Sequence, residues 1–205
     1  MRRGSSGIPT DSTTWETIPI TVHFLELTSE KEILTREVDV SHVRIYQVVN
    51  PDPRFSQWLY RSVGHSWYWI DRYFWSLQQW KSRFSDPNVT LWVLEIDSGN
   101  DSQIAGYYEL DSQFCMDTEV SYFGLMDQAI GRGLGSYLLG DCLHRAFALG
   151  ADRVWLHTCT LDHPRALANY EARGMTVYKT VQDLSLIHIS RCRRYSLCRS
   201  RWSPY

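Results

Sequence analysis

Residues 118–135 read TEVSYFGLMDQAIGRGLG, in which a strand pattern leads into a glycine-rich loop. The strand pattern covers 118–126, and an apolar stripe with helical spacing follows the loop from about 133 to 149. Glycine tolerates positive φ angles and lets the backbone approach a ligand, so amides around Gly131, Gly133 and Gly135 favour an anion. The N-terminus of the next helix favours the same ligand. A phosphate group is therefore expected, although a tight turn without a ligand explains the glycines equally well.

Other phosphate-binding motifs do not fit this loop. A Walker loop needs a lysine, and none lies here, which excludes that motif. A dinucleotide fingerprint reads G-x-G-x-x-G early in a βαβ unit, whereas this loop reads G-x-G-x-G late in the chain. It also follows a predicted hairpin, 91–97 with 103–111. The segment Gln128–Gly133 matches instead the Gln/Arg-x-x-Gly-x-Gly/Ala signature of coenzyme A binding in the GNAT acetyltransferase superfamily.

The remaining chain predicts strands and helices in one domain. With 205 residues, 43% of them hydrophobic, it is long enough for one substantial core but short for two full domains. Predicted strands cover 21–28, 43–49, 91–97, 103–111, 118–126, 153–160 and 175–181. Predicted helices cover 54–64, 76–85, 133–149 and 164–172.

The order of hairpin, strand, glycine loop, helix, strand, helix and strand from about Leu91 to Val181 resembles the catalytic core of GNAT acetyltransferases. The segments YFGLMDQAIGRGLGSYLL and WLHTCTLDHPRALANYEARGM look especially like a bacterial-type subgroup. The resemblance implies an α+β, three-layer fold of the GNAT acyl-CoA N-acyltransferase type. Such a fold has a mixed, mostly antiparallel twisted sheet flanked by helices.

The ends of the chain differ from its middle. Residues 1–18 are polar and rich in Gly, Ser and Thr, so we expect a mobile N-terminal segment. A single acetyltransferase domain is expected over 19–183, with an acceptor-side half over 19–90 and an acetyl-CoA-binding core over 91–183. Residues 184–205 turn to Arg, Ser and Cys and resemble translated sequencing-adapter sequence, so we expect a non-native tail. If the native chain ends before this tail, the final strand of the family fold is missing.

The resemblance also implies which residues contact acetyl-CoA. Phe123, Gly124 and Leu125 would line the thioester arm, with an amide near Leu125 polarising its carbonyl, although core packing also explains Phe123 and Leu125. His163 departs from the family, which commonly has Asn there, and a local hydrogen bond at a helix start is its alternative role. The other implied contacts, most of them to the pyrophosphate, are Ile130, Gly131, Arg132, Gly133, Leu134, Gly135, Ser136 and Asn169.

Two further residues are candidates for catalysis. Acyl transfer needs a neutral amine, but alkyl amines have pKa values of about 10, so a base must remove a proton. Glu119 resembles the catalytic glutamate of histone acetyltransferases in this superfamily, Glu109 is the alternative base, and a solvated strand edge explains either without catalysis. Tyr170 lies in ALANYEARGM, which resembles the family pattern A-x-x-x-Y-e-x-x-G-F. The resemblance implies that Tyr170 assists departure of the thiolate, with a packing role as the alternative.

The implied activity is transfer of an acetyl group from acetyl-CoA to a primary amine by direct attack in a ternary complex. A non-catalytic acyl-CoA-binding or regulatory module and a structural interaction domain are the alternatives. The acceptor would be a small-molecule or peptide amine, and no nucleic-acid partner is expected. The tryptophan-rich run HSWYWIDRYFW (65–75) would either wall an acceptor pocket or belong to the core.

Composition argues against several other classes. No apolar run is long enough to span a bilayer, and the start lacks the apolar run of a secretory signal. We therefore expect a cytoplasmic protein without a membrane partner, as a monomer or homodimer. The cysteines form no C-x-x-C pair. No fourth ligand accompanies His157, Cys159 and His163, so no metal site is expected.

Overall fold

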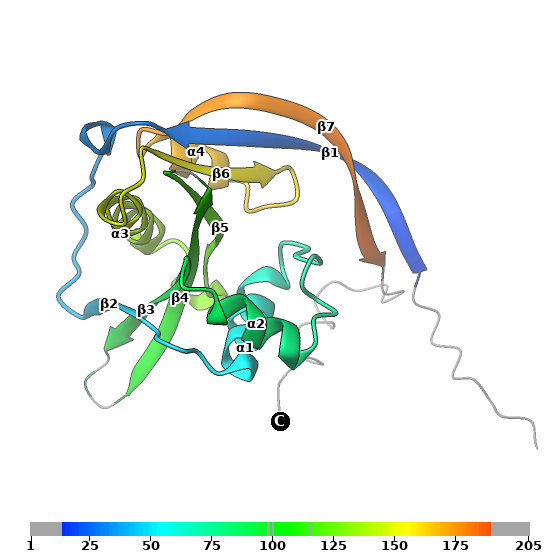
Figure 1. The fold of residues 1–205 in the computed structure, drawn as a ribbon, viewed down its shortest axis with the longest axis horizontal. Helices are drawn as coiled ribbons and strands as arrows, with labels where there is room; N and C mark the ends of the chain where they lie inside the picture. The colour runs from blue at the N-terminus through cyan, green and yellow to red at the C-terminus, as the bar shows by residue number, and fades with distance from the viewer. Residues whose placement is uncertain (1–13, 98, 100, 115, 190–205) are drawn as a thin grey trace, which may run out of the picture. The chain divides into compact units, whose positions relative to one another are not determined.

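The computed structural model describes residues 14–97, 99, 101–114 and 116–189 (Figure 1). By its internal contacts the chain divides into two compact units, residues 20–183 and, as the second, residues 1–19 with 184–205. The described part of the second unit consists of the start of strand β1 (Thr14–Leu27) and the end of strand β7 (Thr176–Ile189). All residues predicted to form the site lie in the first unit.

The described residues form one sheet of seven strands. Besides β1 and β7, these are β2 (Val43–Gln47), β3 (Val89–Asp97), β4 (Ser102–Phe114), β5 (Asp117–Leu125) and β6 (Arg153–Cys159). Their order in the sheet is β2-β3-β4-β5-β6-β1-β7. The pairs β2–β3, β3–β4, β4–β5 and β1–β6 are antiparallel, whereas β5 and β6 are parallel. The predicted mixed, mostly antiparallel sheet is confirmed.

Helices connect the strands, and local sequence explains where they begin. The α-helices are α1 (Pro53–Gly64), α2 (Leu77–Ser85), α3 (Leu134–Ala148) and α4 (Ala166–Glu171), with short 3-10 turns η1 (Glu30–Glu32) and η2 (Asp127–Ala129). The Asp52 carboxylate accepts from the Arg54 amide at 2.7 Å, and Pro53 occupies the first position of α1. Ser76 and Gln79 form a capping box at the start of α2.

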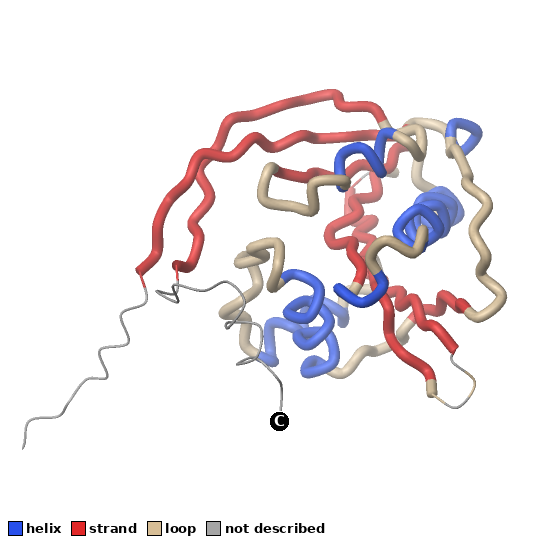
Figure 2. Tube along the Cα trace, turned by 180° about the vertical axis from the view of Figure 1, so that it is seen from behind, coloured by secondary structure: helices blue, strands red, loops and turns tan. Residues whose placement is uncertain are grey.

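Helices cover both faces of the sheet. Figures 1 and 2 show β4 and β5 between α3 on one side and α1 with α2 on the other. Successive side chains of β4 point to opposite faces of the sheet. Tyr108 belongs to the buried cluster under α3, and Tyr107 belongs to the cluster under α1 and α2. Leu138 and Leu143 of α3 are fully buried, as the apolar stripe predicts. The predicted three-layer α+β architecture is confirmed.

Strand β1 comes from the N-terminal part of the chain, yet it lies between β6 and β7. It pairs with β6 over residues 22–27. On its other side, the Nδ1 atom of His23 lies 3.1 Å from the hydroxyl of Thr180 on β7. The N-terminal segment therefore supplies an inner strand of the sheet, a position that the sequence pattern does not specify.

Both β1 and β7 are longer than the sequence pattern indicates. Strand β1 begins at Thr14, so residues 14–18 of the expected mobile segment are a strand, in line with their Thr, Trp and Ile content. Residues 1–13 lie outside the described residues. Strand β7 continues to Ile189, in line with the apolar and β-branched residues of LSLIHI. The rest of the expected tail, 190–205, also lies outside the described residues.

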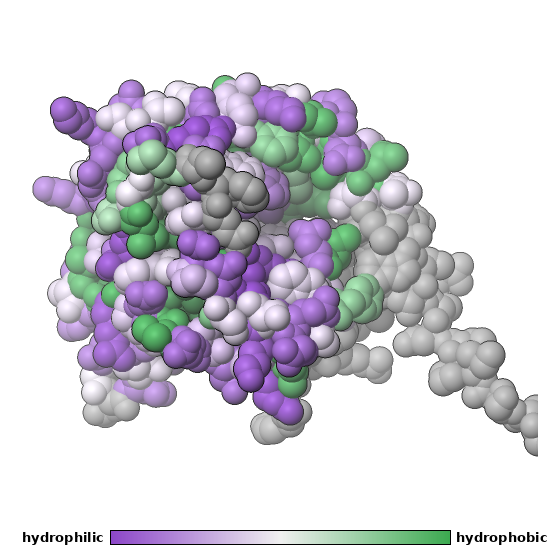
Figure 3. Space-filling view, in the orientation of Figure 1, coloured by the Kyte–Doolittle hydropathy of each residue, from purple (hydrophilic) through white to green (hydrophobic). Residues whose placement is uncertain are grey.

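The surface seen in Figure 3 is mainly hydrophilic, with hydrophobic residues in separate patches. Scattered hydrophobic exposure of this kind is normal for a folded domain. Among the helices of the described residues, none has the length and apolar character needed to cross a membrane.

Candidate active site

Strands β5 and β6 diverge next to the glycine loop (Figure 1). They pair only where residues 117–119 meet residues 153–155. Beyond this point β5 stays paired with β4 as far as Leu125, while β6 stays paired with β1 as far as Cys159. Residues 120–125 of β5 therefore present a backbone edge that is bonded to no other described strand on the β6 side. Such an edge offers N–H and C=O groups with which an extended ligand can pair.

The backbone direction along this edge follows from the contact with β4. The Met126 amide donates to the Ala105 carbonyl oxygen at 2.8 Å. Successive amides of a strand point to opposite sides, so the Leu125 N–H points away from β4 and toward the diverging edge. A β-bulge places Ser121 outside the regular register with β4, and bulges bend the strand that carries them. The Leu125 amide, which is predicted to polarise a thioester carbonyl, thus lies on the edge of β5 that is not paired with β6.

Two glycines of the loop have left-handed backbone conformations. Gly131 has a φ of 85°, and Gly133, which caps α3, has a φ of 79°. A side chain at Gly131 would meet no atom within 4 Å, whereas at Gly133 a Cβ would lie 3.5 Å from Val38. Backbone conformation rather than crowding is therefore the main reason for glycine at both positions.

The loop leaves a run of backbone amides at the start of α3. The amide of Ile130 donates to a carbonyl of η2 at 3.3 Å, and that of Ser136 donates back to the loop at 3.2 Å. Both already have partners, so the amides of Gly131 to Gly135 are better placed for a ligand. Leu134 is buried in the core and can contribute only its backbone, whereas Arg132 is exposed.

Helix α4 approaches this loop and β5. The side-chain amide of Asn169 donates to the Gly135 carbonyl at 3.5 Å. The next residue, Tyr170, packs edge-on against Phe123, with ring centroids 6.0 Å apart. Residues of β5, the loop and α4 that lie far apart in sequence are thus brought together.

Tyr170 is 7% exposed. Burial raises the pKa of its hydroxyl well above the ordinary value, and the negative charge of Asp162 acts in the same direction. The phenol is therefore protonated at neutral pH and is a hydrogen-bond donor.

His163 lies in the turn between β6 and α4. Its Nδ1 atom accepts a hydrogen bond from the Arg165 amide at 3.1 Å. Its ring packs edge-on against Trp67, with centroids 5.0 Å apart. The structure thus gives His163 a local hydrogen bond, the alternative role considered for it, together with a contact to the tryptophan-rich run.

Glu119 points to the sheet face covered by α1 and α2, because the adjacent Val120 packs into the cluster under α3. Its Oε1 atom lies 3.9 Å from Nδ1 of His157 on β6. Burial raises the pKa of Glu119, and a positive charge on His157 opposes this rise. A carboxylate with a raised pKa is a stronger base than an ordinary glutamate.

Glu109 lies on the same face but belongs to a buried ion-pair network. The Arg72 Nη1 donates to both carboxylate oxygens at 2.8 Å. Arg83 lies 3.5 Å from the same carboxylate and also pairs with Asp111. Arg72 and Glu109 are 7% and 1% exposed. Guanidinium groups already bind both carboxylate oxygens of Glu109, whereas the Glu119 side chain is 26% exposed, so Glu119 is the more accessible of the two candidate bases.

The tryptophan-rich run is divided between the core and the region beside β5. Trp69 and Trp75 pack against the cluster under α1 and α2. The Arg72 guanidinium stacks between rings, 4.6 Å from the Trp75 centroid and 4.3 Å from that of Tyr122. Asp71 is exposed, and its carboxylate accepts from the Tyr122 hydroxyl at 3.3 Å. Core packing thus explains Trp69 and Trp75, whereas Asp71 is available to solutes.

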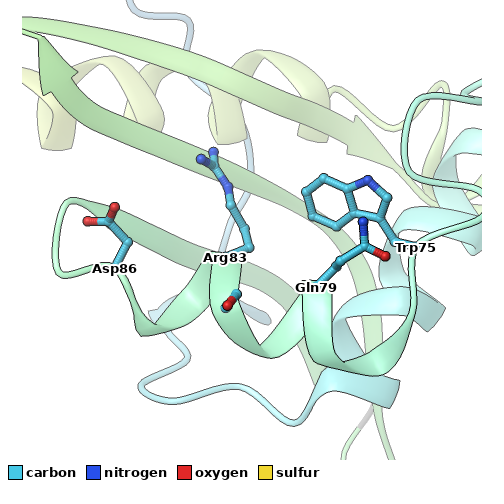
Figure 4. Close-up of a pocket in the computed structure, with 5 residues that line it drawn as sticks. Trp75, Gln79, Arg83 and Asp86 are labelled. Carbon is cyan, nitrogen blue, oxygen red and sulfur yellow. The ribbon is translucent and has the colours of Figure 1, made fainter.

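A pocket of about 310 Å³ lies along α2 (Figure 4). In Figure 4 the Arg83 side chain extends from α2 toward the strands of the sheet. The pocket is lined by Trp75, Gln79, Ser82, Arg83 and Asp86. No residue predicted to contact acetyl-CoA lines it, so it is separate from the predicted cofactor contacts.

Sequence reasoning missed the charged residues on the sheet face covered by α1 and α2, which are Asp71, Arg72 and Arg83. The sequence does contain one indication of their importance, because Asp71 and Arg72 lie inside a largely aromatic run. Charged side chains in a run that packs against a sheet need polar partners. Within the described residues, no group of three or more His, Cys, Asp or Glu side chains gathers in a way that could hold a metal ion.

Comparison with solved structures identifies proteins of similar fold. The GCN5-related N-acetyltransferase from Sphaerobacter thermophilus superposes with a TM-score of 0.61 at 16% identity, covering 85% of this chain and 53% of that protein. The GCN5-related N-acetyltransferase from Kribbella flavida gives a TM-score of 0.56 at 16% identity, covering 84% and 58%. This chain thus spans little more than half the length of either protein.

A third solved structure is covered over most of its own length. It is an aminoglycoside acetyltransferase from an uncultured soil metagenomic sample, in complex with trehalose, with a TM-score of 0.53 at 16% identity. The match covers 67% of this chain and 90% of that protein. At such identities the likeness shows the fold alone.

Sequence comparison gives the family. No protein with a curated description matches the chain. A family model described as the acetyltransferase (GNAT) family matches residues 44–175, which is more than half of the chain and includes β5, the glycine loop and α4. The resemblance inferred from the glycine loop and its surroundings is confirmed, and the chain belongs to the acetyltransferase (GNAT) family.

Proposed function

We propose that this protein transfers an acetyl group from acetyl-CoA to a primary amine by direct attack in a ternary complex. The observation that carries this proposal is the unpaired edge of β5 at residues 120–125, which leads directly into the glycine loop. An extended amide-containing arm would pair with this edge, and a pyrophosphate would bind the amides of Gly131 to Gly135. Acetyl-CoA supplies an activated acetyl group, so no nucleophilic side chain is required.

The local geometry fits such a ligand. Glycine at positions 131 and 133 permits the positive φ angles of the loop, and a ligand beside Gly131 would meet open space. The exposed Arg132 adds positive charge next to the amides. The Leu125 amide, on the diverging side of β5, would stabilise negative charge that develops on the thioester oxygen.

We assign the proton acceptor to Glu119. The amine must lose a proton as its bond to the acetyl carbon forms, and a base with a raised pKa serves this step near neutral pH. Burial raises the pKa of Glu119, and its position on the α1–α2 face lets it act through a water molecule. Glu109 serves instead to hold Arg72 and Arg83.

Tyr170 would donate a hydrogen bond to the sulfur as the carbon–sulfur bond breaks. Its buried, protonated hydroxyl is a poor acid, so the assistance consists of a hydrogen bond rather than early proton transfer. The exposed Asp71 carboxylate beside Tyr122 would attract a cationic amine. A structure of similar fold is an aminoglycoside acetyltransferase, which supports including aminoglycosides among the candidate acceptors.

The test measures thiol release from acetyl-CoA with a panel of peptide, lysine, polyamine and aminoglycoside amines. Release that depends on an amine supports the proposal. A chain that binds coenzyme A in a calorimetric titration but releases no thiol with any amine would be a non-catalytic acyl-CoA-binding module. A chain that binds no coenzyme A would be a structural domain, and the proposal would be wrong.

A further inference from the structure

The loop between α1 and α2, residues 65–76, is held at two points. Trp67 packs edge-on against His163 in the turn between β6 and α4, with ring centroids 5.0 Å apart. Arg72 donates to both carboxylate oxygens of Glu109 on β4. The loop is therefore tied to elements on both sides of the region where β5 and β6 diverge.

Asp71 lies between these two contacts in the sequence. Its carboxylate accepts a hydrogen bond at 3.3 Å from the hydroxyl of Tyr122, which belongs to the unpaired edge of β5. On the other side, burial raises the pKa of the Cys159 thiol on β6, and the negative charges of Asp162 and Asp71 raise it further. Asp71 therefore lies close to both of the diverging strands.

The side chains around Asp71 point to the same sheet face as the proposed base. Leu156 packs into the cluster under α3, so Cys159, three residues later on β6, points to the face covered by α1 and α2. Tyr122 packs against the cluster on that face. Glu119 also points there, so the Asp71 carboxylate and the proposed base lie on the same side of the sheet.

Tyr122 gives the Asp71 carboxylate a fixed position. Its ring packs edge-on against those of Tyr60 and Trp69, with centroids 5.1 and 5.0 Å away. The Arg72 guanidinium lies 4.3 Å from the centroid of the same ring. The hydroxyl that bonds Asp71 is therefore part of a packed cluster, although Asp71 itself is exposed.

Asp71 forms no ion pair with any basic residue in the part of the chain that the structure describes. Its neighbour in the chain, Arg72, is turned toward Glu109 instead. Arg61 donates to the Tyr73 carbonyl at 3.3 Å and lies over the Tyr73 ring. The basic side chains of α1 and of this loop thus have other contacts, and the negative charge of Asp71 is available to a ligand.

The chemistry of acyl transfer decides which charge Asp71 can bind. The attacking amine must be neutral, and a carboxylate that held it as an ammonium would raise its pKa and oppose the attack. Glu119 is the group proposed to remove its proton, so Asp71 is not needed for that step. An unpaired carboxylate beside the reaction therefore suits a group that stays positively charged throughout, such as a second amine of the same acceptor.

We propose that Asp71 selects acceptors with a second positive charge, so that the preferred acceptor is a diamine or polyamine. One amine reacts while another binds Asp71 as an ammonium. This inference rests on the proposed function and extends it by naming the class of acceptor. Linear diamines and aminoglycosides share this chemistry, and the experiment distinguishes them.

The experiment compares kcat/KM for thiol release between amines of equal chain length, such as putrescine with butylamine and cadaverine with pentylamine. Per reactive amine, we expect the wild type to prefer each diamine by about 5-fold or more, through a lower KM. Asp71→Asn should bring this ratio close to one. Asp101→Asn, at an exposed aspartate on the turn between β3 and β4, is the matched control and should keep the wild-type ratio. Added salt should lower the wild-type ratio, because it screens an exposed ion pair.

An aminoglycoside forms a second arm. Turnover of the aminoglycoside that Asp71→Asn weakens, without a preference for linear diamines, would assign the site to aminoglycosides. If the wild type releases thiol but shows neither preference, or if Asp71→Asn keeps it, the inference is wrong while the proposed function stands. If no amine causes thiol release, the proposed function fails, and calorimetric titration of putrescine decides the Asp71 site. Binding that Asp71→Asn abolishes would then support the site, and no binding would overturn it.

A conservative variant separates the charge of Asp71 from an effect on the loop. Asp71→Glu keeps the carboxylate, so it should retain a preference for diamines that Asp71→Asn lacks. Because Asp71 is exposed, both variants should unfold at the wild-type temperature. An equal loss of preference in both variants would mean that the loop conformation, rather than the charge, is responsible, and would contradict the inference.

Discussion

Arg72 donates to both carboxylate oxygens of Glu109 across 37 residues of sequence, and both side chains are buried. This ion pair connects the loop between α1 and α2 to strand β4 in the middle of the sheet. Arg83 of α2 reaches the same carboxylate, so one acidic residue contacts both α2 and the loop that precedes it. The Glu109 carboxylate is therefore better explained as a structural partner of these two arginines than as a base.

The first prediction concerns the strength of this ion pair. Glu109→Gln leaves Arg72 buried without a counter-charge, so we expect it to lower the free energy of unfolding by about 3–5 kcal/mol. Urea denaturation measures the loss. Asp117→Asn breaks a more exposed pair with Arg153 and is the matched control, expected to change stability by less than about 1 kcal/mol. Equal effects of the two substitutions would contradict this structural role.

The second prediction concerns catalysis by Glu119. Glu119→Gln removes the proposed base but keeps the shape of the side chain, so kcat/KM should fall by about 100-fold or more. Affinity for acetyl-CoA should be unchanged, as measured by calorimetry. The wild-type rate should rise with pH as the carboxyl group loses its proton, and the variant should lack this limb. Glu171→Gln, an exposed change of equal charge on α4, should retain wild-type kinetics.

The third prediction follows from the raised pKa of Glu119 and concerns stability. The folded protein holds the proton of this carboxyl group to higher pH than the unfolded chain does. Stability from this group is therefore present at low pH and is lost as pH rises from the ordinary glutamate pKa through the raised one. Glutamine has no proton to lose, so Glu119→Gln avoids this pH-dependent loss of stability. The variant should therefore unfold at a higher temperature than the wild type at neutral pH, but not at pH 4 or below. A variant that is less stable at neutral pH would show that the carboxylate is stabilised rather than destabilised by its surroundings.

The fourth prediction isolates the hydroxyl of Tyr170. Tyr170→Phe keeps the packing against Phe123, so the fold and the affinity for acetyl-CoA should be preserved. Without the hydrogen bond to the leaving sulfur, kcat should fall by about 10- to 100-fold. Tyr178→Phe, on an exposed part of β7, is the matched control and should leave kcat unchanged. If Tyr170→Phe retains full kcat, the tyrosine has a packing role only.

The fifth prediction compares a glycine of the loop, Gly133, with a glycine inside α3, Gly140. Gly133→Val places a β-branched residue at a φ of 79°, next to Val38, and should weaken coenzyme A binding by at least about 10-fold. Gly140 lies inside α3, where a Cβ would meet no atom within 4 Å. Gly140→Ala should therefore leave binding unchanged and stabilise the protein by about 0.5–1 kcal/mol. Calorimetry and thermal unfolding test both, and unchanged binding by Gly133→Val would refute the role of the loop.

The sequence predicts most of the fold because its elements are strongly periodic. The apolar stripe of α3 and the glycines on either side set its bounds, and the alternation in residues 118–126 identifies β5. The place of β1 in the sheet has no local signature, since it depends on pairing with β6 and β7 far along the chain. Local patterns predict an element's type, but not which distant strand it pairs with.

The candidate site was predictable to a similar extent. The glycine loop and Tyr170 lie in motifs with fixed spacing, which a single sequence displays. Arg72 lies in a loop and Glu109 lies on a strand, and no sequence motif links the two positions. Their pairing therefore could not be predicted.

The position of β1 has a consequence for synthesis of the protein on the ribosome. This strand is synthesised well before its partners β6 and β7. Pairing between residues 22–27 and 154–159 closes a long loop, and such distant contacts form slowly. Until then Leu25 and Leu27, which end up buried, remain accessible to chaperones and proteases. A nascent chain arrested before β6 should therefore be cleaved readily within β1, and one that includes β6 and β7 should be protected there.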